Sequence, residues 1–186
     1  MKWYRDQAKN LSDASGNKVM QSDPKRLLKT TRVGVDNIGA MLIYFYDPKT
    51  KEQLPYYDRF PCVFPIELYG DGFLGINMHY LSPFQRARLM DALYKTAQKK
   101  KTDKQRLQIN YQILKGATQF RTFRPCVKRY LYSHVRSRFF IVRTKEWDTI
   151  LMLPLERFEQ GGAKGGKVGG GISKTKVWSE SMAKVR

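Results

Sequence analysis

The spacing of hydrophobic residues changes at Ser82-Pro83, and this change constrains the fold more than any other feature of the chain. Before this point, aromatic and β-branched residues gather in short runs bounded by turn signals, which predicts strands. The three predicted strands cover 41–46, 56–68 and 73–80. After it, apolar residues recur every three or four positions over 84–97, which predicts an amphipathic helix. Ser82 is its expected cap, and Pro83 suits its first turn.

Further elements are expected along the second half of the chain. A second helix is predicted near 103–116, and a third is predicted to start at Arg124-Pro125. Apolar runs at 139–142 and 149–153 predict a hairpin. Three strands, then helices, then two strands predict an α+β fold, which we interpret as a small antiparallel SH3-like β-barrel with a basic helical insertion at 82–136.

Prolines and a glycine refine the predicted strands. Pro61 and Pro65 disfavour a central position for the second strand, because proline cannot donate a hydrogen bond to a neighbouring strand. Gly75 in the third strand indicates a bulge or a close approach of two backbones.

The chain is expected to have three parts. Residues 1–38 form a basic N-terminal arm, residues 39–160 form the α+β core, and residues 161–186 form a Gly-rich linker with a C-terminal docking peptide. Large aromatic side chains are unusual on extended polar arms. Trp3, Tyr4 and Trp178 are therefore predicted to anchor the extended N- and C-terminal arms on neighbouring molecules.

Positive charge is concentrated in the predicted helical insertion. The chain has 186 residues and a net charge of +19, of which +15 lies in residues 84–145, where seventeen Lys and Arg accompany two Asp. This excess predicts a polyanionic partner, either DNA or an acidic protein surface. Aromatic residues are interleaved with the cations, and aromatic rings can stack on exposed bases. The residues predicted to bind the anion or partner are Arg86, Arg88, Lys99, Lys100, Lys101, Arg121, Arg124, Lys128, Arg129, Arg136 and Arg138.

The sequence disfavours membrane, export and metal-binding functions. No run approaches the roughly 18 apolar residues that a membrane span needs, and the N-terminus lacks the apolar segment of a secretory signal. Cys62 and Cys126 are far apart, which favours two reduced thiols. His79 and His134 lack the spacing of a zinc site and are interpreted as structural. No cofactor is expected.

Enzymatic function is also disfavoured. Four carboxylates would suit a magnesium-dependent nuclease if they converged, and this is a third hypothesis for the function. These carboxylates belong to Asp47, Asp58, Glu67 and Asp71. Asp47 and Asp71 lie in turn signals, and Asp58 can pair with the adjacent Arg59, so structural roles are preferred. The chain is therefore not expected to be an enzyme.

Several strings of residues resemble a family of small virion-morphogenesis proteins of large contractile-tailed, T4-type phages. The resemblance covers about residues 38–160 and the pair Val177-Trp178. The strings are Leu-Pro-Tyr-Tyr-Asp-Arg-Phe-Pro at 54–61, Asp-Gly-Phe-Leu-Gly-Ile-Asn-Met-His-Tyr-Leu at 71–81, Arg-Pro-Cys-Val-Lys-Arg-Tyr-Leu at 124–131 and His-Val-Arg-Ser-Arg at 134–138.

The resemblance implies a non-enzymatic protein and transfers no catalytic residue. The leading hypothesis is a structural subunit of the tail, baseplate or neck, which staples neighbouring virion subunits with its arms in a symmetric hetero-oligomeric assembly. The alternative is a protector protein that binds the ends of the packaged DNA. Either role places the protein in the virion, and in the host cytoplasm during assembly.

Overall fold

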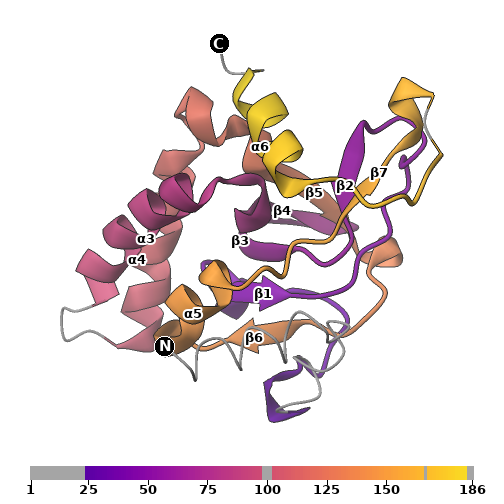
Figure 1. Ribbon diagram of the computed structural model, residues 1–186. Helices are drawn as coiled ribbons and strands as arrows, with labels where there is room; N and C mark the ends of the chain where they lie inside the picture. Colours follow the sequence, from indigo (N-terminus) through magenta and orange to yellow (C-terminus); the bar gives the residue numbers. More distant parts are fainter. Residues whose placement is uncertain (1–23, 98–101, 166, 184–186) are drawn as a thin grey trace, which may run out of the picture.

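The computed structural model describes residues 24–97, 102–165 and 167–183, and its architecture is α+β, as predicted (Figure 1). The strands are β1 (Met41–Ile43), β2 (Tyr56–Asp58), β3 (Cys62–Tyr69), β4 (Gly72–Asn77), β5 (Val127–Leu131), β6 (Phe140–Val142) and β7 (Phe158–Gln160). The α-helices are α3 (Pro83–Ala97), α4 (Asp103–Ala117), α5 (Trp147–Met152) and α6 (Lys174–Ala183). Short 3-10 helices are η1 (Pro24–Arg26), η2 (Val35–Asn37), η3 (Met78–Tyr80), η4 (Arg121–Cys126), η5 (Tyr132–His134), η6 (Thr144–Glu146) and η7 (Gly162–Lys164).

Five strands form one open antiparallel sheet in the order β5-β4-β3-β1-β6, and β2 pairs with β7 in a separate ladder. The sheet does not close, so the predicted SH3-like barrel is not confirmed. The outer edge of β6 is covered by the segment at η1 instead. Leu27 forms a β-bridge with Phe140, and the Arg26 guanidinium donates to the carbonyl of Ile141. Covering an edge strand is an alternative to closing a barrel.

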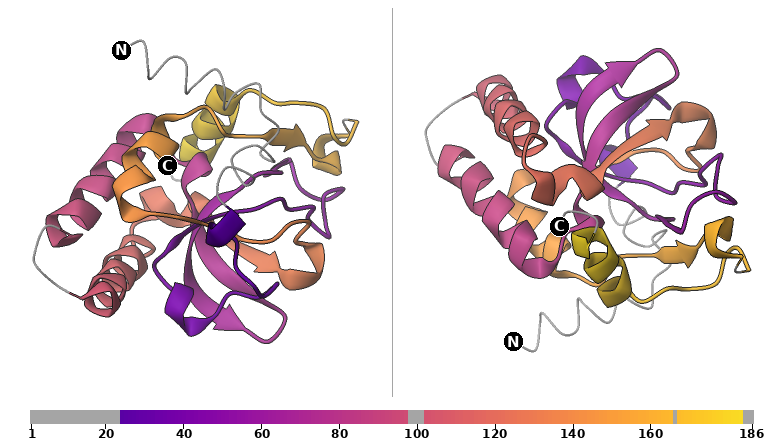
Figure 2. Two further views of the ribbon diagram at one scale, coloured as in Figure 1. Left: turned by 90° about the horizontal axis from the view of Figure 1, so that it is seen from below. Right: turned by 90° about the horizontal axis from the view of Figure 1, so that it is seen from above.

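Both faces of the sheet are buried, because alternate residues of each strand point to opposite sides. In β1, Met41 and Ile43 join the larger core, which also receives side chains of α3, α4, α5 and α6. Leu42 belongs to the second core, on the other face, which is rich in aromatic rings. There the rings of Tyr44 and Phe139 lie 4.8 Å apart, centroid to centroid. Figure 2 shows α3 and α4 packed together beside the sheet.

The two predicted helices after Ser82 are confirmed. The first begins at Pro83, and the Ser82 hydroxyl donates to the side-chain oxygen of Gln85 at 3.0 Å. The second spans Asp103–Ala117, and Thr102 forms a reciprocal capping box with Gln105. Local capping and periodicity were therefore sufficient to locate both helices.

The third predicted helix and the predicted second hairpin are wrong. The segment from Arg124 forms the end of η4 and then β5, because β5 pairs with β4 along five residues. Residues 147–152 are the helix α5, while β6 pairs with β1. The Trp147 ring of α5 packs on Phe64 at 5.0 Å. Short apolar runs do not distinguish strand from helix, so the long-range partners decide.

The predicted edge position of the proline-containing strand is wrong, whereas the predicted close approach at Gly75 is confirmed. Strand β3 is central although it contains Pro65, and a register shift between Pro65 and Glu67 accommodates the proline. Gly75 in β4 approaches β3 closely, as predicted. A Cβ at this position would lie 2.3 Å from the Val63 side chain.

Several described residues of the segments predicted as arms pack on the core. Val33 is buried, and the Leu28 N–H donates to the carbonyl of Phe139 at 2.8 Å. The Gly-rich segment is hydrogen-bonded to β7, since the Gln160 N–H donates to the carbonyl of Gly170. Helix α6 buries Val177 completely.

Candidate nucleic-acid interface

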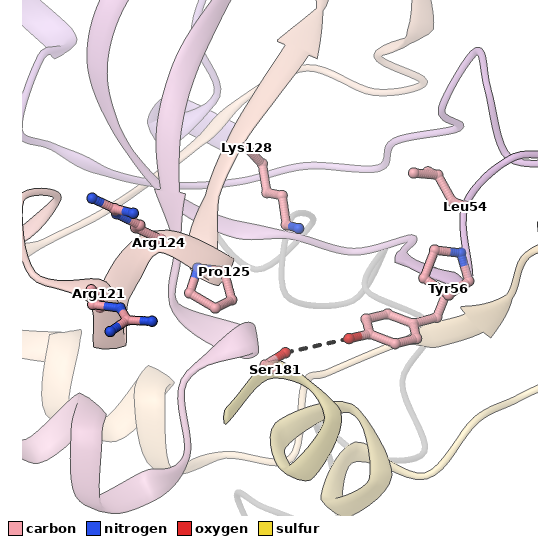
Figure 3. Close-up of a pocket in the computed structure, with 8 residues that line it drawn as sticks. Leu54, Tyr56, Arg121, Arg124, Pro125, Lys128 and Ser181 are labelled. Carbon is pink, nitrogen blue, oxygen red and sulfur yellow. Dashed lines mark hydrogen bonds between the residues drawn. The ribbon is translucent and has the colours of Figure 1, made fainter. Parts of the chain in front are cut away.

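A pocket of about 400 Å³ lies between η4, β5, α6 and the segment that enters β2 (Figure 3). Three cationic side chains, those of Arg121, Arg124 and Lys128, come from η4 and β5. Figure 3 shows the two arginines at one side of the pocket, Leu54 and Tyr56 at the other, and Lys128 between them. The cations of the pocket therefore come from residues that are close in sequence. The residues opposite them come from elements that are distant in sequence.

The geometry of η4 places the two arginines together. In a 3-10 helix, residues three apart lie one above the other, so Arg121 and Arg124 share one side. Cys126 is buried at the end of η4, and its Sγ donates to the carbonyl of Phe123 at 2.8 Å. The chain then enters β5, which presents Lys128 to the same pocket.

Helix α6 and strand β2 build the opposite wall. The Tyr56 hydroxyl lies 3.4 Å from the Ser181 hydroxyl, which joins the two elements (Figure 3). The Trp178 indole N–H donates to the carbonyl of His79 at 2.8 Å, which fixes α6 on η3. Trp178, predicted to anchor the C-terminal arm on a neighbour, is thus bound to the core of its own chain.

A second pocket, of about 340 Å³, adjoins the first, and Leu54 and Lys128 line both. The Lys128 ammonium lies 4.3 Å from the centre of the Tyr80 ring. Four tyrosines line the second pocket: Tyr46, Tyr57, Tyr80 and Tyr130. Burial raises the pKa of Tyr80 and of Tyr130 well above the ordinary value, so both rings are neutral phenols at physiological pH.

Buried polar side chains support the second pocket. The Asp58 carboxyl group lies 2.8 Å from the Nδ1 atom of His79 and accepts a hydrogen bond from the Asn77 amide at 3.0 Å. The same amide also donates to the Tyr130 hydroxyl. The predicted pairing of Asp58 with Arg59 is wrong, since Arg59 pairs with Glu159 at 3.0 Å.

The other carboxylates of the nuclease hypothesis do not join Asp58. Asp47 pairs with Lys51 at 3.1 Å, and Asp71 pairs with Arg129. Within residues 24–97, 102–165 and 167–183, no group of three or more His, Cys, Asp and Glu is arranged to hold a metal ion.

Arg86 is a correction to the predicted anion site, because it is buried and occupied within the chain. Its guanidinium donates to the carbonyls of Met78 and Leu81, and to that of Leu151 from α5. It also pairs with the buried carboxylate of Glu156 at 2.5 Å. Buried charges are stable only when paired, and here the pairing is internal.

The remaining predicted cations are distributed over several elements. Arg88 is exposed on α3, where its guanidinium lies 5.9 Å from the Phe84 ring. Arg129 lines the second pocket, which we call the tyrosine pocket for its four tyrosines, and covers the Tyr69 ring. Arg136 pairs with Asp47 at 3.6 Å, while Arg138 donates to the carbonyls of Leu27 and Leu28. Lys99, Lys100, Lys101, Trp3 and Tyr4 lie outside the described residues.

Sequence reasoning missed the wall that faces the cations. Leu54 and Tyr56 lie in the string at 54–61 that carries the resemblance, and Ser181 lies in the predicted docking peptide. The string at 54–61 and the predicted docking peptide did not indicate this pocket, because a local pattern does not specify which distant residues meet.

The fold and pocket define a class: a basic α+β protein with a cluster of cations at an open pocket suited to phosphate groups. A model of the family described as Phage T4 terminal DNA protecting protein matches residues 2–181, so the chain belongs to this family. No curated protein and no solved structure has a significant match to the chain.

The family match confirms the resemblance to T4-type phage proteins and corrects the leading functional hypothesis. A structural subunit of the tail, baseplate or neck is wrong, since the family is described by the protection of DNA termini. The alternative hypothesis, a protector of DNA ends, agrees with that description. In the part of the chain that the structure describes, no helix has the length and apolar character needed to cross a membrane.

Proposed function

We propose that this protein binds the ends of phage DNA and shields them from exonucleases without catalysing a reaction. The match of residues 2–181 to the family of terminal DNA protecting proteins carries this proposal. The pocket formed by Arg121, Arg124 and Lys128 supports it, because guanidinium and ammonium groups bind phosphate oxygens.

Protection by binding needs only occupancy of the end. An exonuclease must hold the terminal nucleotide before it cleaves, and a bound protein denies it that contact. The net charge of +19 favours rapid association with DNA and supplies affinity through the release of counterions. In this proposal the protein is made in the host cytoplasm and accompanies the genome in the virion. Contacts with other virion subunits stay a prediction.

The test is a digestion of linear duplex DNA by an exonuclease with increasing amounts of protein. We expect the ends to survive, and we expect covalently closed circular DNA to compete poorly for the protein. Equal affinity for linear and circular DNA, together with unprotected ends, would contradict the proposal.

The non-enzymatic part of the proposal has its own test. The protein is incubated with linear and circular DNA in the presence of magnesium and without any added nuclease. Intact DNA is expected, whereas cleavage that disappears in the Asp58→Asn variant would revive the nuclease hypothesis.

A further inference from the structure

The basic pocket, lined by Arg121, Arg124 and Lys128, and the tyrosine pocket adjoin each other, since both are lined by Leu54 and Lys128. We propose that the basic pocket holds a terminal phosphate of a DNA strand and that the tyrosine pocket holds the nucleoside attached to it. This inference rests on the proposed function and adds which part of the DNA end is recognised.

The charge of the basic pocket favours a terminal phosphate. A phosphate monoester carries a charge of about −1.5 to −2 near neutral pH, whereas each internal phosphodiester carries a single charge. Arg121, Arg124 and Lys128 converge on one pocket, and the hydroxyls of Tyr56 and Ser181 lie at its wall as further hydrogen-bonding groups (Figure 3). A monoester, with its higher charge and three terminal oxygens, can accept more hydrogen bonds from these groups than a diester can.

The shape of the basic pocket also favours a strand end. The segment Leu54–Tyr56 and helix α6 face the cations across the pocket, as Figure 3 shows. A continuous strand must enter and leave such a space, whereas a strand end only enters it. Terminal nucleotides are also easier to withdraw from the base stack than internal ones, because they have a stacking neighbour on one side only.

The tyrosine pocket has the character expected for a nucleoside rather than a second phosphate. Its lining includes the accessible parts of Tyr46, Tyr57 and Tyr80, and aromatic surface binds bases of any sequence. It also includes Asp58, whose carboxyl group accepts hydrogen bonds from the Asn77 amide and the Phe60 N–H. A carboxylate repels phosphate, so the two pockets fix the direction of the nucleotide.

The experiment measures the affinity of the full chain for duplexes that carry a 5′-phosphate, a 3′-phosphate or only hydroxyls at their ends, with a closed circle as reference. We expect one of the two phosphorylated duplexes, with either the 5′- or the 3′-phosphate, to bind about tenfold tighter than the duplex with only hydroxyls. In the triple variant Arg121→Gln, Arg124→Gln, Lys128→Gln this preference should shrink below about twofold.

The matched control removes the same charge elsewhere. Lys25, Lys29 and Lys145 are exposed and lie outside both pockets, so their triple replacement by Gln should keep the preference for a phosphorylated end. Thermal unfolding of both triple variants checks that each is folded. A loss of preference in the control variant would contradict the assignment of the pocket.

A second variant tests the tyrosine pocket. Thr50 is exposed and lines this pocket only, so Thr50→Trp should fill it. We expect weaker binding of phosphorylated ends and unchanged binding of the closed circle. Unchanged binding of ends would overturn the nucleoside half of the proposal.

The outcomes separate this inference from the proposed function. If the protein prefers linear to circular DNA but ignores the terminal phosphate, the inference is wrong and end protection stands. If it does not distinguish linear from circular DNA, the proposed function itself is wrong.

Discussion

Arg86 joins four parts of the chain through a single buried guanidinium. It binds carbonyls of η3 and of the turn before α3, a carbonyl of α5, and the carboxylate of Glu156. The Trp178 ring of α6 lies 5.5 Å from its guanidinium carbon. One charged residue therefore specifies how helices from both halves of the chain meet.

Replacing Arg86 should be strongly destabilising. Arg86→Met removes the close partner of the buried Glu156 carboxylate and leaves only the Lys174 ammonium, 3.6 Å away, as its counter-charge, which costs about 3–5 kcal/mol of unfolding free energy. Urea denaturation measures the loss. Arg88→Met, at an exposed position two residues away, is the control and should change stability by less than about 0.5 kcal/mol. Similar stabilities of the two variants would contradict the structural role.

Glu156 should make the protein sensitive to acid. Burial raises the pKa of Glu156, but electrostatic interactions with His79 and Arg86, together with hydrogen bonds from the backbone and from the Arg86 guanidinium, outweigh burial, and the net pKa lies below its ordinary value of 4.5. The folded state thus favours the ionised carboxylate. Its contribution to stability is complete above the pKa of the unfolded chain and is lost as pH falls through the folded pKa.

The Glu156→Gln variant tests this dependence. Between about pH 6 and pH 3, the unfolding free energy of the parent should fall more steeply than that of the variant. Asp36→Asn, an exposed acid, serves as the control and should follow the parent. Parallel curves for the parent and Glu156→Gln would refute the assignment.

At the scale of elements, the pairing of β3 with β4 depends on the absence of a side chain at Gly75. An added Cβ would lie 2.3 Å from the Val63 side chain, and Val63 is fully buried with a restricted rotamer. Gly75→Ala should therefore cost about 1–3 kcal/mol by overpacking. Thermal or urea unfolding measures this cost.

Gly116 in α4 is the matched control for Gly75. No atom lies within 4 Å of a Cβ built at this position, and Gly is a poor helix former. Gly116→Ala should stabilise the protein by about 0.4–1 kcal/mol. Gly→Ala is thus expected to lower the unfolding free energy in β4 and to raise it in α4. Equal changes in the two variants would show that the close approach of β3 and β4 does not exclude a side chain at Gly75.

For the whole molecule, the charge of +19 predicts a strong dependence of DNA affinity on salt. If six to ten phosphates are contacted, affinity for duplex DNA should fall by about 10³–10⁵ between about 50 and 200 mM salt. Fluorescence anisotropy at increasing salt measures the slope. An affinity that is insensitive to salt would show that the excess charge serves another purpose.

The distribution of this charge was predicted only in part. The sequence places +15 in residues 84–145, which suggested a single basic face. The structure divides the residues that it describes: Arg86 is interior, Arg138 binds carbonyls near η1, and Arg121, Arg124 and Lys128 meet in the basic pocket. Charge counts follow from the sequence, but which cations gather depends on where their elements are packed.

The sequence by itself determined α3 and α4, the α+β class, the excess of positive charge and the family. These features depend on composition, on matching motifs, or on caps and apolar spacing within a few residues of one another. Only the tertiary structure decided that 121–128 forms η4 and β5, and that Tyr56 and Ser181 face these cations. The reason is that pairing of β5 with β4 and docking of α6 on η3 join residues far apart in the chain, and local sequence does not encode such partners.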